Sequence, residues 1–176
     1  MKNKMMITLL AVGSALTATH AFAAAGTVNF NGNILDSACD VDVASQNQVV
    51  VLGDYYKTEF PTTGARTAAT QFNIVLKNCP VTVTNAKVRF DGTPDATNSS
   101  LLAIDSSAAG AATGVAINLM SADKADLPLH GSNSYSYVLS SSADNTLSFY
   151  AQYISTAATV TAGPANSVAN FSVVYN

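Results

Sequence analysis

The sequence has 176 residues, of which 48% are hydrophobic and only 11% charged, and its formal net charge is −3 at pH 7. This length suits one domain with a hydrophobic core. Because no cluster of basic residues stands beyond the first few positions, nucleic acid and anionic membrane surfaces are poor candidate partners.

The N-terminal residues are typical of a signal peptide. Two lysines among the first four residues precede an apolar run at 5–16, which is too short to span a bilayer as a mature helix. Ala21-Phe22-Ala23 then places small residues where a signal peptidase reads them. We predict cleavage after Ala23, with Ala21 or Ala24 as fallbacks, so that residues 1–23 are a signal peptide and the mature chain has no membrane span. A transmembrane anchor is the alternative.

Beyond residue 23, apolar and polar residues alternate in a series of short runs. Such runs predict strands with one face in a core and the other face more polar. In chain order they lie at 26–31, 72–77, 87–90, 115–119, 135–137, 147–153 and 169–175. Turn-forming residues separate them and no segment has capped helical spacing, which indicates an all-β sandwich or barrel. Residues 95–114 are expected to form a surface loop around the short run 101–104.

Cys39 and Cys79 are the only cysteines of the sequence. In an exported chain, two cysteines most simply form one disulfide. A zinc site would need more ligands, and His130 is the only histidine beyond the predicted signal peptide. We therefore predict a disulfide between these cysteines, with metal binding or free thiols as the alternatives.

The sequence contains no recognisable catalytic constellation. His130 stands alone in a predicted turn, and the Gly-x-Ser-x-Gly motif of a hydrolase is missing. Glu59 is the sole glutamate, so a carboxylate pair would have to use aspartates from turn-like contexts. Asp40 and Asp42 could hold Ca²⁺, but further oxygen donors are lacking nearby, which favours a solvated face. We expect neither an enzyme nor a cofactor.

The two ends of the mature chain carry the most informative patterns. A tail that opens at Gly163 runs into a final alternating strand with Phe171, Val173 and the penultimate Tyr175. The mature start is a second alternating segment, Gly26-Thr27-Val28-Asn29-Phe30-Asn31-Gly32.

Further motifs, in order and spacing, complete a resemblance to a known family. They are Ser37-Ala38-Cys39-Asp40-Val41, Val51-Leu52-Gly53, the strand from Phe72 to Cys79, and Val88-Arg89-Phe90-Asp91-Gly92. Together with the two ends, they resemble the chaperone–usher pilins of the type 1 fimbrial major-subunit group over essentially the whole mature chain. The resemblance implies an incomplete immunoglobulin-like β-sandwich. Such a sandwich lacks its last strand, is completed by a donor strand from a neighbouring subunit, and has an open groove above its core.

In this family a periplasmic chaperone lends a strand to the groove, and in the fibre the N-terminal extension of the next subunit replaces that strand. The resemblance therefore implies a donor-strand extension at 24–31 and a pilin domain at 32–176. It places Gly26, Val28 and Phe30 in the groove of a neighbour. It also implies that the groove edge and the chaperone contact include Gly163, Phe171, Val173 and Tyr175. The alternative is that residues 26–31 begin the first strand of the subunit's own sheet.

The function that the resemblance implies is structural. We expect a subunit that polymerises with identical or related pilins into a surface fimbria supporting cell adhesion. Its assembly partners would be a periplasmic chaperone and an outer-membrane usher. A minor adaptor or tip-associated subunit is the alternative, and a secreted enzyme is the third reading, for which the sequence offers no site.

Overall fold

The computed structural model describes residues 26–32, 34, 38–131 and 133–175. The chain divides into two units, Met1–Ile34 and Leu35–Asn176. The predicted signal peptide, residues 1–23, lies outside the described residues. In the first unit, residues 26–32 and 34 are exposed and belong to neither a helix nor a strand.

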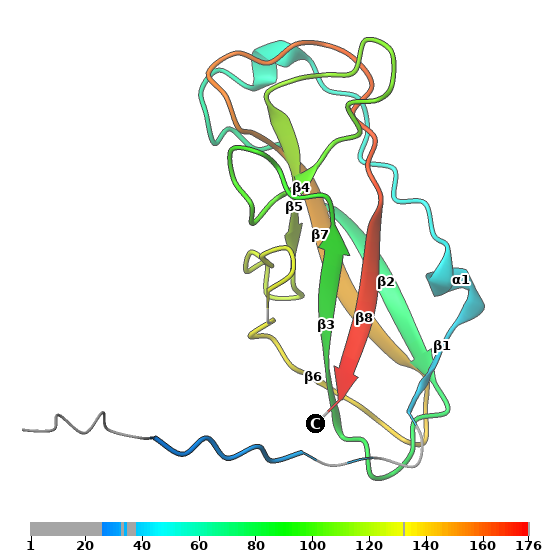
Figure 1. Ribbon diagram of the computed structural model, residues 1–176. Helices are drawn as coiled ribbons and strands as arrows, with labels where there is room; N and C mark the ends of the chain where they lie inside the picture. Colours follow the sequence, from blue (N-terminus) through cyan, green and yellow to red (C-terminus); the bar gives the residue numbers. More distant parts are fainter. Residues whose placement is uncertain (1–25, 33, 35–37, 132, 176) are drawn as a thin grey trace, which may run out of the picture. The chain divides into compact units, whose positions relative to one another are not determined.

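The second unit is a sandwich of two antiparallel sheets, which confirms the predicted all-β fold class (Figure 1). Its strands are β1 (Asp40–Val41), β2 (Thr70–Lys77), β3 (Asn85–Gly92), β4 (Leu102–Ala103), β5 (Val115–Met120), β6 (Tyr137–Val138), β7 (Asn145–Ser155) and β8 (Ala169–Tyr175). One sheet has the order β1-β2-β7-β5-β4 and the other the order β6-β3-β8.

Two short helices and β4 depart from the predicted pattern. Helix α1 (Val43–Gln46) is capped by Asp42, whose carboxylate accepts a hydrogen bond from the amide of Ala44 at 3.0 Å, and a single 3₁₀ turn occupies Lys57–Glu59. The expected surface loop at 95–114 was only partly right. Leu102 pairs with Ile117 of β5 and is buried, so this stretch adds an edge strand to the core.

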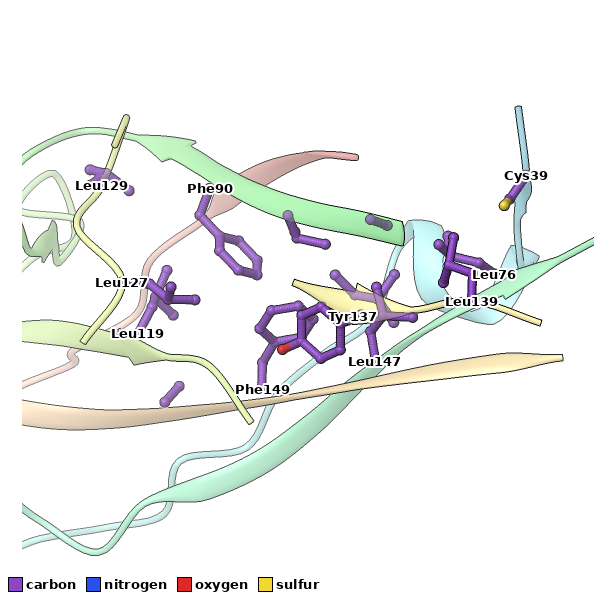
Figure 2. Packing of buried hydrophobic residues seen from close by; sticks show 14 of the residues in the cluster. Cys39, Leu76, Phe90, Leu119, Leu127, Leu129, Tyr137, Leu139, Leu147 and Phe149 are labelled. Atoms are coloured by element: carbon purple, nitrogen blue, oxygen red, sulfur yellow. The ribbon is translucent and has the colours of Figure 1, made fainter. Parts of the chain in front are cut away.

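The centre of the sandwich is a cluster of aromatic rings around Phe149 of β7, which is fully buried. The ring centroids of Phe90 and Tyr137 both lie 5.2 Å from that of Phe149, and Figure 2 shows the three rings packed together. Phe72, the cross-strand partner of Phe149 on β2, stacks on it at 5.6 Å. Aromatic pairs at such distances stabilise a core beyond the area that they bury. The alternation read from the sequence therefore points these side chains inward.

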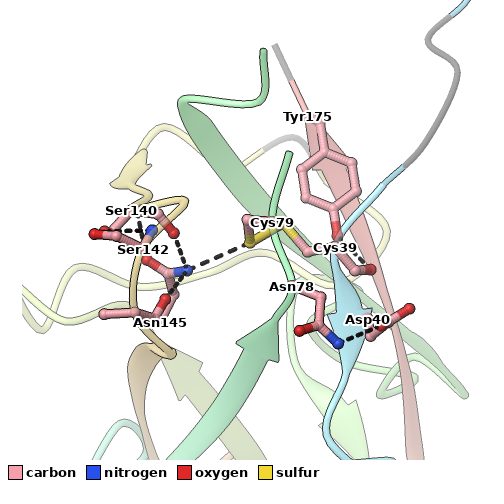
Figure 3. The surroundings of a disulfide bond; sticks show 9 residues. Cys39, Asp40, Asn78, Cys79, Ser140, Ser142, Asn145 and Tyr175 are labelled. Atoms are coloured by element: carbon pink, nitrogen blue, oxygen red, sulfur yellow. Dashed lines mark hydrogen bonds between the residues drawn. A yellow bond between two sulfur atoms is a disulfide. The ribbon is translucent and has the colours of Figure 1, made fainter. Parts of the chain in front are cut away.

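A disulfide between Cys39 and Cys79 joins the residue before β1 to the loop after β2, with the two Cα atoms 4.2 Å apart. Asn145 lies against it and donates a hydrogen bond from Nδ2 to the sulfur of Cys79 at 3.3 Å (Figure 3). The bridge fastens the very short β1 to its sheet. None of the helices in the described part of the chain is long and apolar enough to cross a membrane.

Candidate functional site

The last strand, β8, is an edge strand. It pairs with β3 along its whole length, from Ala169 opposite Gly92 to Tyr175 opposite Ala86. It ends the order β6-β3-β8, so within the described ranges its other edge faces no strand. An unpaired edge presents free backbone groups on which another strand can form hydrogen bonds.

A second unpaired segment, residues 48–54, follows α1 and lies beside β2. Gln48 ties it there, because its Nε2 donates to the carbonyl oxygen of Asn73 at 3.1 Å. Val50 and Leu52 are half-buried, whereas Val49 and Val51 are 89% and 76% exposed. This alternation is that of a strand with one inward face. The segment therefore has strand-like burial without strand pairing.

A groove of about 890 Å³ lies between residues 48–54 on one side and residues 160–171 on the other. Core side chains from both sheets form its floor, namely Phe72, Ile74, Phe90, Leu102, Ile117, Leu119 and Ala151. Among its described lining residues, only Asp54 and Lys57 are charged. Such a site suits the apolar face of an extended chain better than a charged ligand. The groove thus opens the hydrophobic core along an unpaired strand edge.

Three of the residues predicted for the groove edge lie on one face of β8. Phe171, Val173 and Tyr175 are half-buried against the core, while the intervening Ser172 and Val174 are exposed. Phe171 lines the groove, with its ring centroid 6.5 Å from that of Phe90. Val173 and Tyr175 continue the same face toward the disulfide, and burial raises the pKa of the Tyr175 phenol.

Gly163 lies outside β8, in the loop that leads into it, and also lines the groove. A Cβ atom here would come within 2.7 Å of the amide nitrogen of Ala112 and would also collide with the backbone of Gly110. Only glycine allows two backbone segments to approach so closely. The structure therefore gives this residue a packing role at the end of the groove, between the loop before β8 and residues 110–112.

The predicted donor residues all belong to the first unit. Val28 is 73% exposed and Phe30 is 91% exposed, and a Cβ at Gly26 would meet nothing within 4 Å. Two large apolar side chains on alternate positions therefore stand in solvent. That costs free energy, since burying each would contribute about 1.5–3 kcal/mol.

The inward residues of the second wall, Val50 and Leu52, were missed as site residues. Val51-Leu52-Gly53 was recognised in the sequence as a family motif, but no role was predicted for it. Four apolar residues stand in a row at 49–52, so the run shows no period of two. The signal that could have found them is the unbroken apolar run itself, because a solvent-exposed loop rarely contains one.

The side chains considered for chemistry are engaged in structural contacts. His130 was expected to stand alone, but its Nδ1 lies 2.8 Å from Oδ1 of Asp91. This contact lowers the pKa of the Asp91 carboxyl. Asp40 accepts a hydrogen bond from Asn78 at 2.9 Å, whereas Asp42 pairs with Lys77 at 2.6 Å. Within the described ranges, no group of three or more His, Cys, Asp or Glu residues could hold a metal ion.

Comparison with known proteins adds relatives to this geometry. The chain is 38% identical to the type-1 fimbrial protein A chain of Escherichia coli K12, over 99% of this chain and all of the relative. It is 40% identical to the fimbrial subunit type 1 of Klebsiella pneumoniae, over 85% of this chain and 83% of the relative. It is 41% identical to a probable major fimbrial subunit of Escherichia coli O157:H7, over 92% and 91%.

Solved structures share the fold. A type I fimbria protein of Burkholderia pseudomallei is 37% identical and superposes with a TM-score of 0.61, over 80% of this chain and 91% of that one. A subunit of a chaperone–usher pilus is 27% identical, with a TM-score of 0.66 over 90% of this chain and all of that one. The family model described as fimbrial protein matches residues 28–176. With this match, and with relatives of 38–41% identity over most of their length, the chain belongs to the fimbrial protein family.

Proposed function

We propose that this fimbrial protein is a structural subunit that polymerises into a surface fimbria by donor-strand exchange. In this proposal, the extension at 24–31 of one subunit fills the groove beside β8 of the next. The domain at 32–176 carries that groove, and residues 1–23 direct export. The observation that carries the proposal is the groove itself, a largely apolar opening onto the core beside an unpaired strand edge.

The extension has the chemistry that the groove needs. Val28 and Phe30 stand on alternate positions, so both point to the same side when the segment is extended. Their exposed side chains match an apolar floor, and the backbone of the segment can bond to the free edge of β8. Gly26 continues the alternation with no side chain, which suits a shallow part of the groove.

The same groove calls for a partner during export. Apolar surface open to water beside an unpaired edge is an aggregation hazard. A periplasmic chaperone that lends a strand would cover it until an outer-membrane usher passes the subunit to the growing fibre. Relatives named as A chain and major subunit favour the rod over a minor adaptor or tip-associated role. The family is structural, so no catalytic step enters the proposal.

The test is assembly by variants of the extension. Phe30→Asp and Val28→Asp should abolish fibres, because each would place a carboxylate in an apolar groove at a cost of several kcal/mol. Asn29→Asp is the matched control, since it introduces the same charge at the intervening position. Electron microscopy of cells that produce each variant as their only rod subunit gives the readout. Normal fibres from both Phe30→Asp and Val28→Asp would refute donor-strand exchange through these residues.

A further inference from the structure

We propose that Asn31 is a site of spontaneous deamidation in the unassembled subunit, and that insertion of the extension into a neighbouring groove protects it. The first half depends only on local chemistry. The second half rests on the proposed function. Together they predict that subunits which wait too long before assembly are chemically altered within their donor segment.

The chemistry follows from the dipeptide Asn31-Gly32, the one place in the sequence where glycine follows asparagine. The backbone nitrogen of Gly32 attacks Cγ of Asn31 and forms a new N–C bond, while the bond from Cγ to the side-chain nitrogen breaks. That nitrogen leaves as ammonia, taking up the proton that the backbone amide loses. Water then opens the five-membered succinimide at either carbonyl, giving aspartate or isoaspartate. No oxidant or cofactor is required.

Ring closure requires a backbone that can rotate until the two atoms meet, and this segment offers one. Asn31 and Gly32 are both exposed, and the described residues around them, 26–32, belong to no helix or strand. A Cβ at Gly32 would meet nothing within 4 Å. Glycine also reaches backbone conformations that other residues avoid, and its missing side chain leaves the attacking nitrogen unobstructed. An intramolecular attack of this kind is fast once the geometry is accessible.

Two other sites of the chain serve as internal comparisons. Asn29 lies in the same exposed segment but precedes the bulky Phe30, so it has the exposure without the following glycine. Asp91 precedes Gly92 and could form the same ring by loss of water, but it lies in β3. Its carboxylate is held by His130 at 2.8 Å and by Arg89 at 3.0 Å. We therefore expect fast conversion only where a following glycine and a free backbone coincide.

The products differ from the original segment in charge and, for isoaspartate, in backbone length. Residues 24–31 contain no charged side chain, so conversion adds a carboxylate at Asn31, which shares its side of the extended segment with Asn29 rather than with Val28 and Phe30. The isoaspartate product also routes the backbone through its β-carbon and thus adds one atom immediately after Phe30. Because side chains alternate with a strict period of two, that insertion changes the register between the donor residues Gly26, Val28 and Phe30 and the domain that follows them.

The experiment follows the exported protein before assembly and, in parallel, within fibres, at physiological temperature and mildly alkaline pH. Peptide mapping by mass spectrometry and labelling with an isoaspartyl methyltransferase measure conversion at each site. In the unassembled protein, Asn31 should convert at least about tenfold faster than Asn29, a barrier difference of about 1.4 kcal/mol. Equal rates at the two asparagines would overturn the deamidation site.

Variants and fibres separate the two halves. Gly32→Ala and Asn31→Gln should each suppress isoaspartate at this position, and persistence of the label in both would contradict the mechanism. Fibres should convert more slowly than unassembled protein. If both forms convert at the same rate, protection fails and burial of the extension is called into question, while the deamidation site stands. If neither form converts, the deamidation site is wrong and the donor-strand proposal is unaffected.

Discussion

The hydroxyl of Tyr175 lies 3.4 Å from the carbonyl oxygen of Cys39 and donates a hydrogen bond to it (Figure 3). Cys39 immediately precedes β1 and is bonded through sulfur to Cys79, so the end of the last strand is tied to the start of the first at the disulfide. This hydrogen bond lies beyond Phe171, the last residue of β8 that lines the groove.

The first prediction concerns this hydrogen bond. Tyr175→Phe should lower the free energy of unfolding by about 0.5–1.5 kcal/mol, because the carbonyl of Cys39 loses its donor. Tyr175→Ala should cost more, since it also removes an apolar ring worth about 1.5–3 kcal/mol on burial. Val174→Ala, at the exposed neighbouring position, is the control. Denaturant titration of the purified protein measures the stability of each variant. Equal stabilities for Tyr175→Phe and Tyr175→Ala would show that the ring of Tyr175 does not stabilise the fold by packing.

The second prediction concerns the groove edge. Phe171→Ser should reduce the amount of exported protein recovered with the proposed periplasmic chaperone, because Phe171 lines the groove and packs near Phe90. Ser172→Ala changes the outward neighbour on the same strand and should leave recovery unchanged. Quantitative blotting of periplasmic extracts compares the two. Wild-type recovery of the Phe171 variant would mean that this face of β8 is not the capture surface.

The third prediction concerns Gly163. Gly163→Ala should destabilise the domain by about 1–3 kcal/mol, because the new methyl group must displace the backbone of residues 110–112. Ala162→Ser, one position earlier and exposed, should have little effect. Thermal unfolding of both variants provides the measurement. An undiminished melting temperature for the glycine variant would show that the two loops can separate freely.

The fourth prediction is a pH dependence. The Arg66 guanidinium contacts both carboxylate oxygens of Asp126, at 3.1 and 3.0 Å, and Asn118 donates to Oδ1 at 2.7 Å. Arg66 first, and Asn118 second, hold the pKa of Asp126 below its usual value despite partial burial. The unfolded chain therefore takes up this proton at a higher pH than the folded protein does. The contribution of this pair to stability is complete above about pH 4 and is lost as the pH falls through the lowered pKa.

Asp126→Asn should accordingly lose stability at neutral pH and show a shallower decline in acid than the unmodified protein. Asp54→Asn is the control, because Asp54 lies outside the ion pairs found in the described part of the chain. Chemical unfolding at a series of acidic pH values tests the difference in slope. Parallel curves for the Asp126 variant and the unmodified protein would exclude a role for this pair.

The strands that could be predicted from the sequence are those in which apolar and polar residues alternate. The inward face of β8, with Phe171 and Tyr175, and the core strands β2 and β7 follow from a period of two, because each has one face in the core. The two-residue strands β1 and β4 are too short to display a period. Leu102 is buried only because β5 lies beside it, which is a contact between distant parts of the chain.

Only one of the two walls of the candidate groove could be predicted from the sequence. The pattern located β8 but not the opposite wall at 48–54, where four consecutive apolar residues conceal which ones point inward. The groove itself is a missing strand, and no residue pattern encodes what is missing. The groove could be predicted from the sequence only through the resemblance to a family. In the structure, the unpaired edge of β8 reveals it.

The placement of groove and extension on different residues of one chain has a consequence for polymer geometry. In the proposed donor-strand exchange, the contact between these two unlike surfaces would be heterologous, so it would not close on itself as a two-fold dimer does, and it could repeat without limit. A finite filament of this subunit alone would then carry one empty groove at one tip and one unused extension at the other. Such a polymer would be polar, with two ends that differ in chemistry. Growth and capping at each end can therefore be controlled separately.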